Sequence, residues 1–443
     1  MKPTTLHAIS PESFFGLSDS QVLFLIHDHF GPELSCLKRA YSHHELSSTQ
    51  PSTPSPSQIL FDAQYDEINR TLVSILALRW LYNGQYDIFV GSQAPTVKLS
   101  RASFEWTRAF FVDAVTDEQD LYALITSVVI NDLGKDAQLA STYRERTGID
   151  ISALNHDAIL LKAVDADLVT CLDRLPARQK TAVVRGLRLG ADFNFGQLAQ
   201  AENAPACLSV VQEMRGQSYA FHLHFMEQLL DIAGAAGHLD WTCAQKLIEP
   251  ILQAYHSAYD VTTDVVAGTL SPRDGYNRIL VNRALALQEK GFRTLGIDDP
   301  NDRALMRLLC MGGVASLETA QLFDGTWSEL ETPTKNVLVH ALNVDGTPGE
   351  PAIQPTYMPA LLTQTVDADG PRTQEEKKRA LLSSLRYLAR VMTVDGKWEG
   401  SASVIERDVL NVLKEVAQSP QFRADPTILE RAIVPEGTVC MKG

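Results

Sequence analysis

The sequence lacks the features that mark membrane-spanning, secreted and disulfide-rich proteins. None of its stretches approaches the roughly 20 consecutive apolar residues that a transmembrane helix needs. The N-terminus, Met1 to Thr5, does not show the basic-then-apolar pattern of a secretion signal. The six cysteines are far apart and include no Cys-x-x-Cys pair, which argues against a zinc ribbon and a disulfide scaffold. We therefore expect a cytoplasmic protein with free, mostly buried thiols and no membrane partner.

Common catalytic motifs are missing as well. The sequence has no Gly-x-x-x-x-Gly-Lys-Ser/Thr phosphate loop, no Gly-x-Ser-x-Gly elbow, no His-Glu-x-x-His pair and no Gly-x-Gly-x-x-Gly after a strand. Positive charge is scarce, because 39 Lys and Arg stand against 54 Asp and Glu and leave a net charge of −15. Like charges repel, so this balance disfavours broad, non-specific binding of nucleic acid but not a local basic patch.

The chain does have the apolar content of a large helical core. Hydrophobic residues make up 45% and charged residues 21%, as in ordinary soluble proteins. A Ser- and Pro-rich run at 47–57 predicts a linker or loop between an N-terminal segment, 1–46, that packs on the body and a helical domain, 58–443.

Apolar residues recur at helical spacing through most of this body. The expected helices are 66–82, 119–131, 157–172, 219–236, 241–260, 277–291, 302–311, 314–323, 376–393 and 402–418. The best strand candidates are the short runs Ile88–Val90 and Val337–Val339. We therefore predict an all-α fold, a single large helical domain with few or no strands.

The segment Asn131-Asp132-Leu133-Gly134-Lys135 follows an apolar helix and resembles the second motif of the HD-domain metallohydrolases. In that family a His-Asp pair at a helix end binds a divalent metal that activates water. Asn131 stands in the place of the histidine, and an amide is a poorer transition-metal ligand than imidazole. In the alternative, structural interpretation, Asp132 accepts backbone N–H groups at a turn and Gly134 ends the helix.

Two further segments place polar side chains beside apolar ones. His156 lies at the start of an apolar helix, between two residues that can cap it, and could reach a site. Gln197, Gln200 and Glu202 fall near one face of a short helix. Such a face suits hydrogen bonding to a polar ligand, or else forms a polar core network.

The helix expected at 219–236 carries the most informative polar face. His224, Glu227 and Asp231 lie at positions i, i+3 and i+7, on one side of the helix. These side chains could bind a metal, or the two carboxylates could hold a guanidinium. A solvated charged face is the third interpretation, and it is weakened because no Lys or Arg lies between Arg215 and Lys246. The segment 234–237, Gly-Ala-Ala-Gly, allows close approach of another helix or a ligand.

Basic residues gather in two helices of this acidic chain. Either group could hold a phosphate backbone such as a tRNA acceptor stem, although an ordinary charged surface with acids nearby is the simpler interpretation. The first group is Arg174, Arg178, Lys180, Arg185 and Arg188, and the second is Lys377, Lys378, Arg379, Arg386 and Arg390.

Several of these segments together are similar to a fungal family, the arginine-containing cyclodipeptide synthases. They are Asn131–Asp136, Asn155–Asp157, Asn194–Asn203 and the helix at 219–241. The resemblance covers most of the chain after residue 57. It implies a secondary-metabolism transferase that condenses arginine, drawn at least partly from aminoacyl-tRNA, with a second amino acid into a diketopiperazine.

The resemblance also directs attention to the stretch Asp298-Asp299-Pro300-Asn301-Asp302. The family is associated with an Asp-Asp-x-x-Glu motif needed for activity, and Asp302 stands where that motif has Glu. The same stretch suits a helix N-terminus, with Asp299 as cap and Pro300 at the first position. Both roles can hold at once.

This activity needs a base that deprotonates an amino group and carboxylates that hold a guanidinium. The candidate catalytic residues are Asp298, Asp299, Asp302, Asp132 and His156. The candidate substrate-binding residues are Glu227, Asp231, Gln197, Gln200 and Glu202. No cofactor is expected. The alternatives are an HD-type hydrolase, which would hold a divalent metal, and a non-catalytic helical interaction protein.

Overall fold

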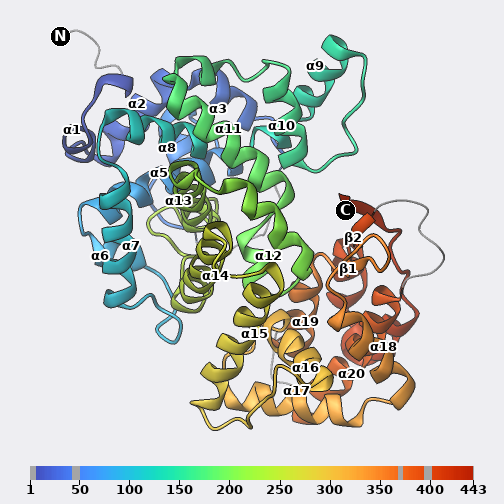
Figure 1. Ribbon diagram of the computed structural model, residues 1–443. Coiled ribbons are helices and arrows are strands. Elements are labelled where there is room, and N and C mark those ends of the chain that lie inside the picture. The colour runs from blue at the N-terminus through green and yellow to red at the C-terminus, as the bar shows by residue number, and fades with distance from the viewer. Residues whose placement is uncertain (1–5, 42–49, 368–372, 394–401, 443) are drawn as a thin grey trace. The chain divides into compact units, whose positions relative to one another are not determined.

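The computed structural model describes residues 6–41, 50–367, 373–393 and 402–442. Helices dominate these ranges, and the strands within them form one small sheet (Figure 1). The fold is all-α with few strands, as the sequence predicts. Contacts within the chain define two compact units, which are unit 1, residues 1–191 and 216–253, and unit 2, residues 192–215 and 254–443.

Unit 1 is a group of packed helices. Its elements are η1 (Leu6–Ala8), α1 (Pro11–Phe15), α2 (Asp19–His29), α3 (Gly31–Leu37), α4 (Pro56–Phe61), α5 (Asp66–Tyr82), α6 (Tyr86–Val90), α7 (Arg101–Ala114), α8 (Glu118–Ile130), η2 (Leu133–Lys135), α9 (Ala137–Thr147), α10 (His156–Asp165), η3 (Thr170–Arg174), α11 (Ala177–Asp192, whose last residue belongs to unit 2) and α13 (Ser218–Gly234). Helix α5 contacts α13, α7 and α8, and α13 also contacts α8. These contacts make α5 and α13 the centre of the unit (Figure 1).

Sequence explains why α5 and α8 lie inside. Ile68, Leu72, Ile75 and Trp80 of α5 are buried, in the range that the periodicity predicts. Helix α8 buries every residue from Asp120 to Ile130. A helix that is apolar on all sides must be surrounded by other elements, so the polar residues that follow α8 are held inside the unit.

Unit 2 combines helices with the sheet. Its elements are α12 (Phe195–Ala199), η4 (Pro205–Met214), α15 (Pro272–Gln288), α16 (Pro300–Met311), α17 (Leu317–Glu329), α18 (Thr332–Asn343), β1 (Ala352–Gln354), α19 (Met358–Asp367), α20 (Gln374–Met392), β2 (Ala402–Glu406), α21 (Leu410–Val412), the π-helix η5 (Leu413–Ala417), α22 (Pro420–Ala424), η6 (Pro426–Arg431) and β3 (Thr438–Lys442). Helix α14 (Glu249–Ala267) begins in the sequence of unit 1 and ends in that of unit 2. The core of unit 2 gathers apolar side chains from α16 to η6.

The strands lie where the sequence pattern did not place them. Strand β2 pairs in parallel with β1 and antiparallel with β3, so the expected helix 402–418 is wrong before Leu410, where α21 begins. Both strand candidates are also wrong, because Ile88–Val90 ends α6 and Val337–Val339 lies within α18. Apolar runs of three residues carry no usable period, so packing decides their conformation.

Several helix starts follow local capping chemistry. The side chain of Thr373 caps α20 by accepting from the backbone N–H of Glu376, and Glu376 accepts in return from the N–H of Thr373. Ser55 and Gln58 make the same capping box at α4, which therefore begins at Pro56, inside the Ser/Pro-rich segment. In the part of the chain that the structure describes, no helix is both long and apolar enough to cross a membrane.

Candidate functional site

A cluster of charged side chains lies where α5, α13, η2 and the start of α10 meet in unit 1. Helix α13 contacts α5, and α10 contacts η2. The fold brings together four of the predicted site residues, which are Asp132, His156, Glu227 and Asp231. We call the group of interacting residues the acidic cluster; its members are Glu67, Arg70, Asp132, Lys135, His156, Asp157, His224, Glu227 and Asp231.

Lys135 links two of the carboxylates of the acidic cluster. Its Nζ lies 2.8 Å from Oδ1 of Asp132 and 3.0 Å from Oε2 of Glu67. The second oxygen of Glu67 pairs with Arg70, 2.9 Å away. Burial lowers the pKa of Lys135, but the charges of Asp132 and Glu67 outweigh burial and raise it. Lys135 is therefore a fixed positive charge inside the cluster.

His156 stands at the edge of the acidic cluster. Its Nε2 lies 3.4 Å from Oδ1 of Asp157 and 3.8 Å from Oδ1 of Asp132. The side chain is 40% exposed, whereas Asp132 is 8% exposed. Asn155 caps α10 and so fixes the start of the helix that carries His156.

Glu227 is the most deeply placed acid of α13. The residue is 3% exposed, and its Oε2 accepts from Nε2 of Gln228 at 3.1 Å and lies 3.4 Å from Nδ1 of His224. Its other oxygen, Oε1, has no hydrogen-bond partner among the described residues. A buried carboxylate oxygen without a donor costs free energy.

Asp231, one turn further along α13, is held partly neutral. Burial and the neighbouring charge of Glu227 raise its pKa to about 6, against the opposing charges of Lys135 and Arg70. Burial also raises the pKa of Asp157. Because the acidic cluster holds five carboxyl groups but only two permanent cations, Arg70 and Lys135, its negative charge is not balanced from within.

Glycines allow the backbone to approach closely around this cluster. A Cβ on Gly134 would lie 1.9 Å from the carbonyl oxygen of His156, so only glycine fits between η2 and α10. A Cβ on Gly234 would lie 2.1 Å from Oγ of Ser74 and 2.3 Å from the carbonyl oxygen of Arg70. The predicted close approach at the end of α13 is thus confirmed, and its neighbour is α5.

The predicted residues Gln197, Gln200 and Glu202 lie in unit 2 and do not share one face. Oε1 of Gln197 accepts from Gln354, and Gln200 is exposed. Ala201 adopts a positive φ after α12 ends, which turns the chain before Glu202. Oε1 of Glu202 accepts from the backbone N–H of Tyr357 at 2.5 Å, and burial raises the pKa of Glu202 to about 8.

The three aspartates before α16 make the contacts of a helix N-terminus. Asp299 is the N-cap, with Oδ1 accepting from the N–H groups of Asn301 and Asp302. Asp302 accepts from the N–H of Gly296 and pairs with Arg293, while Asp298 is exposed. These residues lie in unit 2 and contribute nothing to the acidic cluster. Their catalytic role stays a prediction.

The basic group of unit 1 contains two arginines that differ from the rest. Arg174, Lys180 and Arg188 form ion pairs with Glu33, Asp173 and Asp165. No such pair is found for Arg178 or Arg185 among the described residues. Both line a cavity of about 470 Å³ formed by α11 and residues 216–220 at the start of α13.

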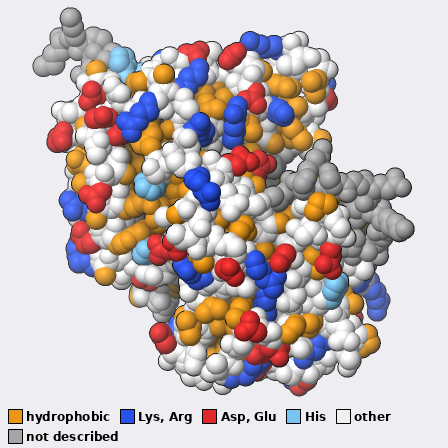
Figure 2. Space-filling model, in the orientation of Figure 1, with side chains coloured by type: hydrophobic (Ala, Val, Ile, Leu, Met, Phe, Trp, Pro, Cys, Tyr) orange, Lys and Arg blue, Asp and Glu red, His pale blue; other side chains and the backbone are white. Residues whose placement is uncertain are grey.

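Three of the five residues in the basic group of unit 2 bond to other residues of the same unit. Lys378 pairs with an acid of α17, and Arg386 pairs with Glu331 and Glu430. Arg390 donates to backbone carbonyls of η6 and the residue after it. Lys377 and Arg379 have no ion pair in the described part of the chain. On the face that Figure 2 shows, Lys and Arg side chains are interspersed with Asp and Glu.

The sequence pattern missed Glu67 and Arg70. Both lie on α5 at i and i+3, which is the spacing of an ordinary solvated ion pair. Their burial follows only from the packing of α13 against α5. Among the residues that the structure describes, no group of three or more His, Cys, Asp or Glu is arranged to hold a metal ion.

Comparison with known proteins identifies a family but not an activity. No curated protein and no solved structure matches the chain. One family model, described as a family of unknown function (DUF6829), matches residues 23–429. That match spans most of both units. The chain belongs to the DUF6829 family.

Proposed function

We propose that the protein is a cyclodipeptide synthase that makes an arginine-containing diketopiperazine, and that the acidic cluster binds the arginine guanidinium. The proposal depends on one observation above all, the unbalanced negative charge of the cluster around the unpartnered Oε1 of Glu227. A guanidinium supplies both the missing positive charge and the missing donors. Its planar fork pairs with carboxylates through two parallel hydrogen bonds.

Within this proposal Glu227 and Asp231 bind the substrate. They lie one turn apart on α13, so both carboxylates can face one guanidinium. Arg70 and Lys135 hold the neighbouring carboxylate of Glu67 and keep it from competing for the ligand. Binding of a guanidinium would favour ionised Asp231 and so lower its pKa from about 6.

The reaction itself joins two aminoacyl esters. The amino group of the second amino acid attacks the ester carbonyl of arginyl-tRNA; a C–N bond forms, the C–O bond breaks and the ribose hydroxyl leaves. The arginine amino group then attacks the ester of the second amino acid and closes the ring, releasing the second ribose hydroxyl. Each attack needs an amine that has lost a proton, and His156 between Asp132 and Asp157 is our candidate acceptor.

The aminoacyl-tRNA would approach through the cavity lined by Arg178 and Arg185. These arginines have no carboxylate partner in the described part of the chain, so their charge is available to phosphate. The guanidinium of Arg178 lies 4.3 Å from the ring centroid of Tyr219, which supports it. The unit 2 group offers less, because Arg386 and Arg390 on α20 are already bonded.

The test is synthesis in vitro from arginyl-tRNA and a mixture of other aminoacyl-tRNAs, with the products identified by mass spectrometry. The wild-type protein should release an arginine-containing diketopiperazine, and Glu227→Gln should reduce its formation about a hundredfold. Glu145→Gln, which removes an exposed acid of α9, is the matched control and should retain activity.

Absence of any arginine-containing diketopiperazine, with every pairing tried, would overturn the proposal. Stoichiometric iron, manganese or zinc in protein purified without chelator would instead favour the HD-type hydrolase. Full biological output from folded variants of Asp132, Glu227 and Asp231 would favour a non-catalytic interaction protein.

A further inference from the structure

Two arginines of unit 2 are buried without an acidic partner. Arg303 and Arg307 lie one turn apart on α16 and are 1% and 0% exposed. Isolated charges are costly to remove from water, and buried arginines are normally paired with carboxylates. This pair is therefore an exception that calls for a physical reason.

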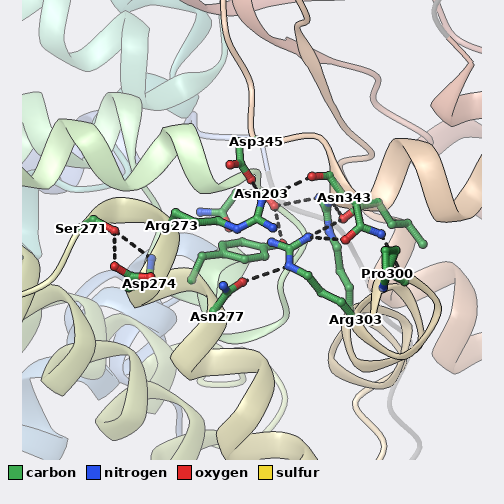
Figure 3. Close-up of polar contacts among 12 residues, drawn as sticks. Asn203, Ser271, Arg273, Asp274, Asn277, Pro300, Arg303, Asn343 and Asp345 are labelled. Carbon is green, nitrogen blue, oxygen red and sulfur yellow. Dashed lines mark hydrogen bonds and ion pairs between the residues drawn. The ribbon is translucent and has the colours of Figure 1, made fainter. Parts of the chain in front are cut away.

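Among the described residues, all the hydrogen-bond acceptors of these two guanidiniums are neutral oxygens. Arg303 donates to Oδ1 of Asn277 at 3.0 Å, to Oδ1 of Asn343 at 3.2 Å and to the carbonyl of Leu342 at 3.1 Å (Figure 3). Arg307 donates only to backbone carbonyls, which belong to Ala201, Glu202, Asn203 and Leu342. Carbonyl and amide oxygens satisfy donors, but they do not neutralise charge.

The surroundings add positive charge rather than removing it. Burial lowers the pKa of Arg303 to about 10, and the charges of Arg273 and Arg307 act in the same direction. Glu202 does not compensate, because burial raises its pKa to about 8 and it is mostly protonated at neutral pH. Asp345 pairs with Arg273 rather than with either buried arginine (Figure 3).

Buried polar atoms without a hydrogen-bond partner among the described residues lie at the same place. Nη2 of Arg303 is buried and has no hydrogen-bond partner among the described residues. Asn203 is 1% exposed, and neither atom of its side-chain amide has a described partner. Its carbonyl oxygen accepts from Arg307 and from the hydroxyl of Tyr276, so the residue belongs to this group (Figure 3).

A cavity of about 410 Å³ in unit 2 adjoins this group, although neither Arg303 nor Arg307 lines it. Asn343 and Asp345 both line it, and they are the residues that contact Arg303 and Arg273. Asp345 is followed by Gly346, which has a φ of +97° that favours glycine. The carboxylate of Asp345 thus occupies the position on Arg273 that an incoming anion would take.

We propose that unit 2 binds a phosphate group in this cavity, where it replaces the carboxylate of Asp345 on Arg273 and neutralises Arg303 and Arg307. Phosphate carries close to two negative charges at neutral pH, and its oxygens match the fork of a guanidinium. The group can belong to free phosphate or to a phosphate monoester. This site is independent of the acidic cluster and does not rest on the proposed synthase activity.

Calorimetric titration of the full chain with inorganic phosphate tests the site, with sodium chloride at equal ionic strength as the control. We expect saturable binding with a dissociation constant below about 1 mM. Asp345→Asn removes the competing carboxylate and should tighten binding about tenfold. Asn203→Asp places a carboxylate among the arginines and should weaken binding about tenfold.

Glucose 6-phosphate and glycerol 3-phosphate, as monoester probes, distinguish a monoester site from one for free phosphate. Asn203→Asp should also raise the melting temperature in phosphate-free buffer, because the new carboxylate neutralises buried positive charge. This measurement tests the proposal even if the Asp345→Asn variant does not fold. Absence of saturable binding by the wild-type chain would overturn the proposal. Equal phosphate affinity in the wild type and folded Asn203→Asp would overturn it too.

Discussion

Lys135 is the residue on which the charge arrangement of unit 1 most depends. Among the described residues it alone pairs with both Asp132 and Glu67, which are buried. We expect Lys135→Met to leave Asp132 without a permanent cation and Glu67 with Arg70 alone, and to lower the free energy of unfolding by about 3 kcal/mol. Urea denaturation measures the change. Lys162→Met, which removes an exposed lysine of α10, should change it by less than about 0.5 kcal/mol. Equal effects of the two substitutions would refute the assigned role.

Asp231 makes the stability of unit 1 depend on pH. Its pKa is about 6 in the folded chain and about 3.9 when unfolded, so the folded state binds the proton more tightly. Its contribution is therefore complete below pH 4 and is lost as the pH rises through 6. Relative to wild type, Asp231→Asn should gain about 2 kcal/mol in unfolding free energy between pH 4 and pH 7. Urea titrations at both pH values measure this difference, and a constant difference would contradict it.

Some residues of the acidic cluster could be predicted from the sequence, and others could not. Asp132, His156, Glu227 and Asp231 could be selected because polar residues stood within apolar helices. Glu67 could not, because its i, i+3 relation to Arg70 is that of a solvated surface pair. The buried arginines of α16 were missed for the same reason, since an amphipathic pattern does not report which polar residues a neighbouring element covers.

Among the elements, the contact between α13 and α5 shapes the acidic cluster. Gly234 faces Ser74 and the carbonyl of Arg70 at distances that leave no space for a methyl group. Gly234→Ala should therefore move the helices apart, lower the unfolding free energy by about 2 kcal/mol and reduce diketopiperazine formation.

A second glycine substitution controls for helix propensity. Gly325 lies within α17 and has no atom within 4 Å of the position of a Cβ. Gly325→Ala should raise the unfolding free energy by about 0.5–1 kcal/mol in the same denaturation experiment. If both alanines stabilise the protein, the close packing of α13 on α5 is not a constraint.

Helices were predictable where their own sequence determines them. The predicted range 66–82 coincides with α5, and α8, α13 and α20 begin and end within two residues of expectation. The strands were not, because β2 is defined by its hydrogen bonds to β1 and β3, which are distant in sequence. Local periodicity contains no information about such partners.

For the molecule as a whole, the negative net charge confines the proposed tRNA contact to the two arginines of α11, Arg178 and Arg185, that have no acidic partner among the described residues. The double variant Arg178→Gln, Arg185→Gln should bind aminoacyl-tRNA more weakly. It should also reduce the slope of log affinity against log salt by about two, roughly one for each lost phosphate contact. Filter binding at several salt concentrations measures the slope. Arg188 pairs with Asp165, so Arg188→Gln should leave the slope unchanged. A decrease in slope as large as that of the double variant would refute the assignment.

The alternation of the two units along the chain has a consequence for synthesis on the ribosome. Residues 192–215 belong to unit 2, yet they are made before α13, which belongs to unit 1. A nascent chain that has reached residue 217 therefore lacks Glu227 and Asp231, and it already carries a segment whose partners begin at residue 254. Neither unit can be obtained by a single cut of the gene, and a stop codon before residue 218 would leave Glu67, Arg70, Asp132 and Lys135 without the helix that covers them.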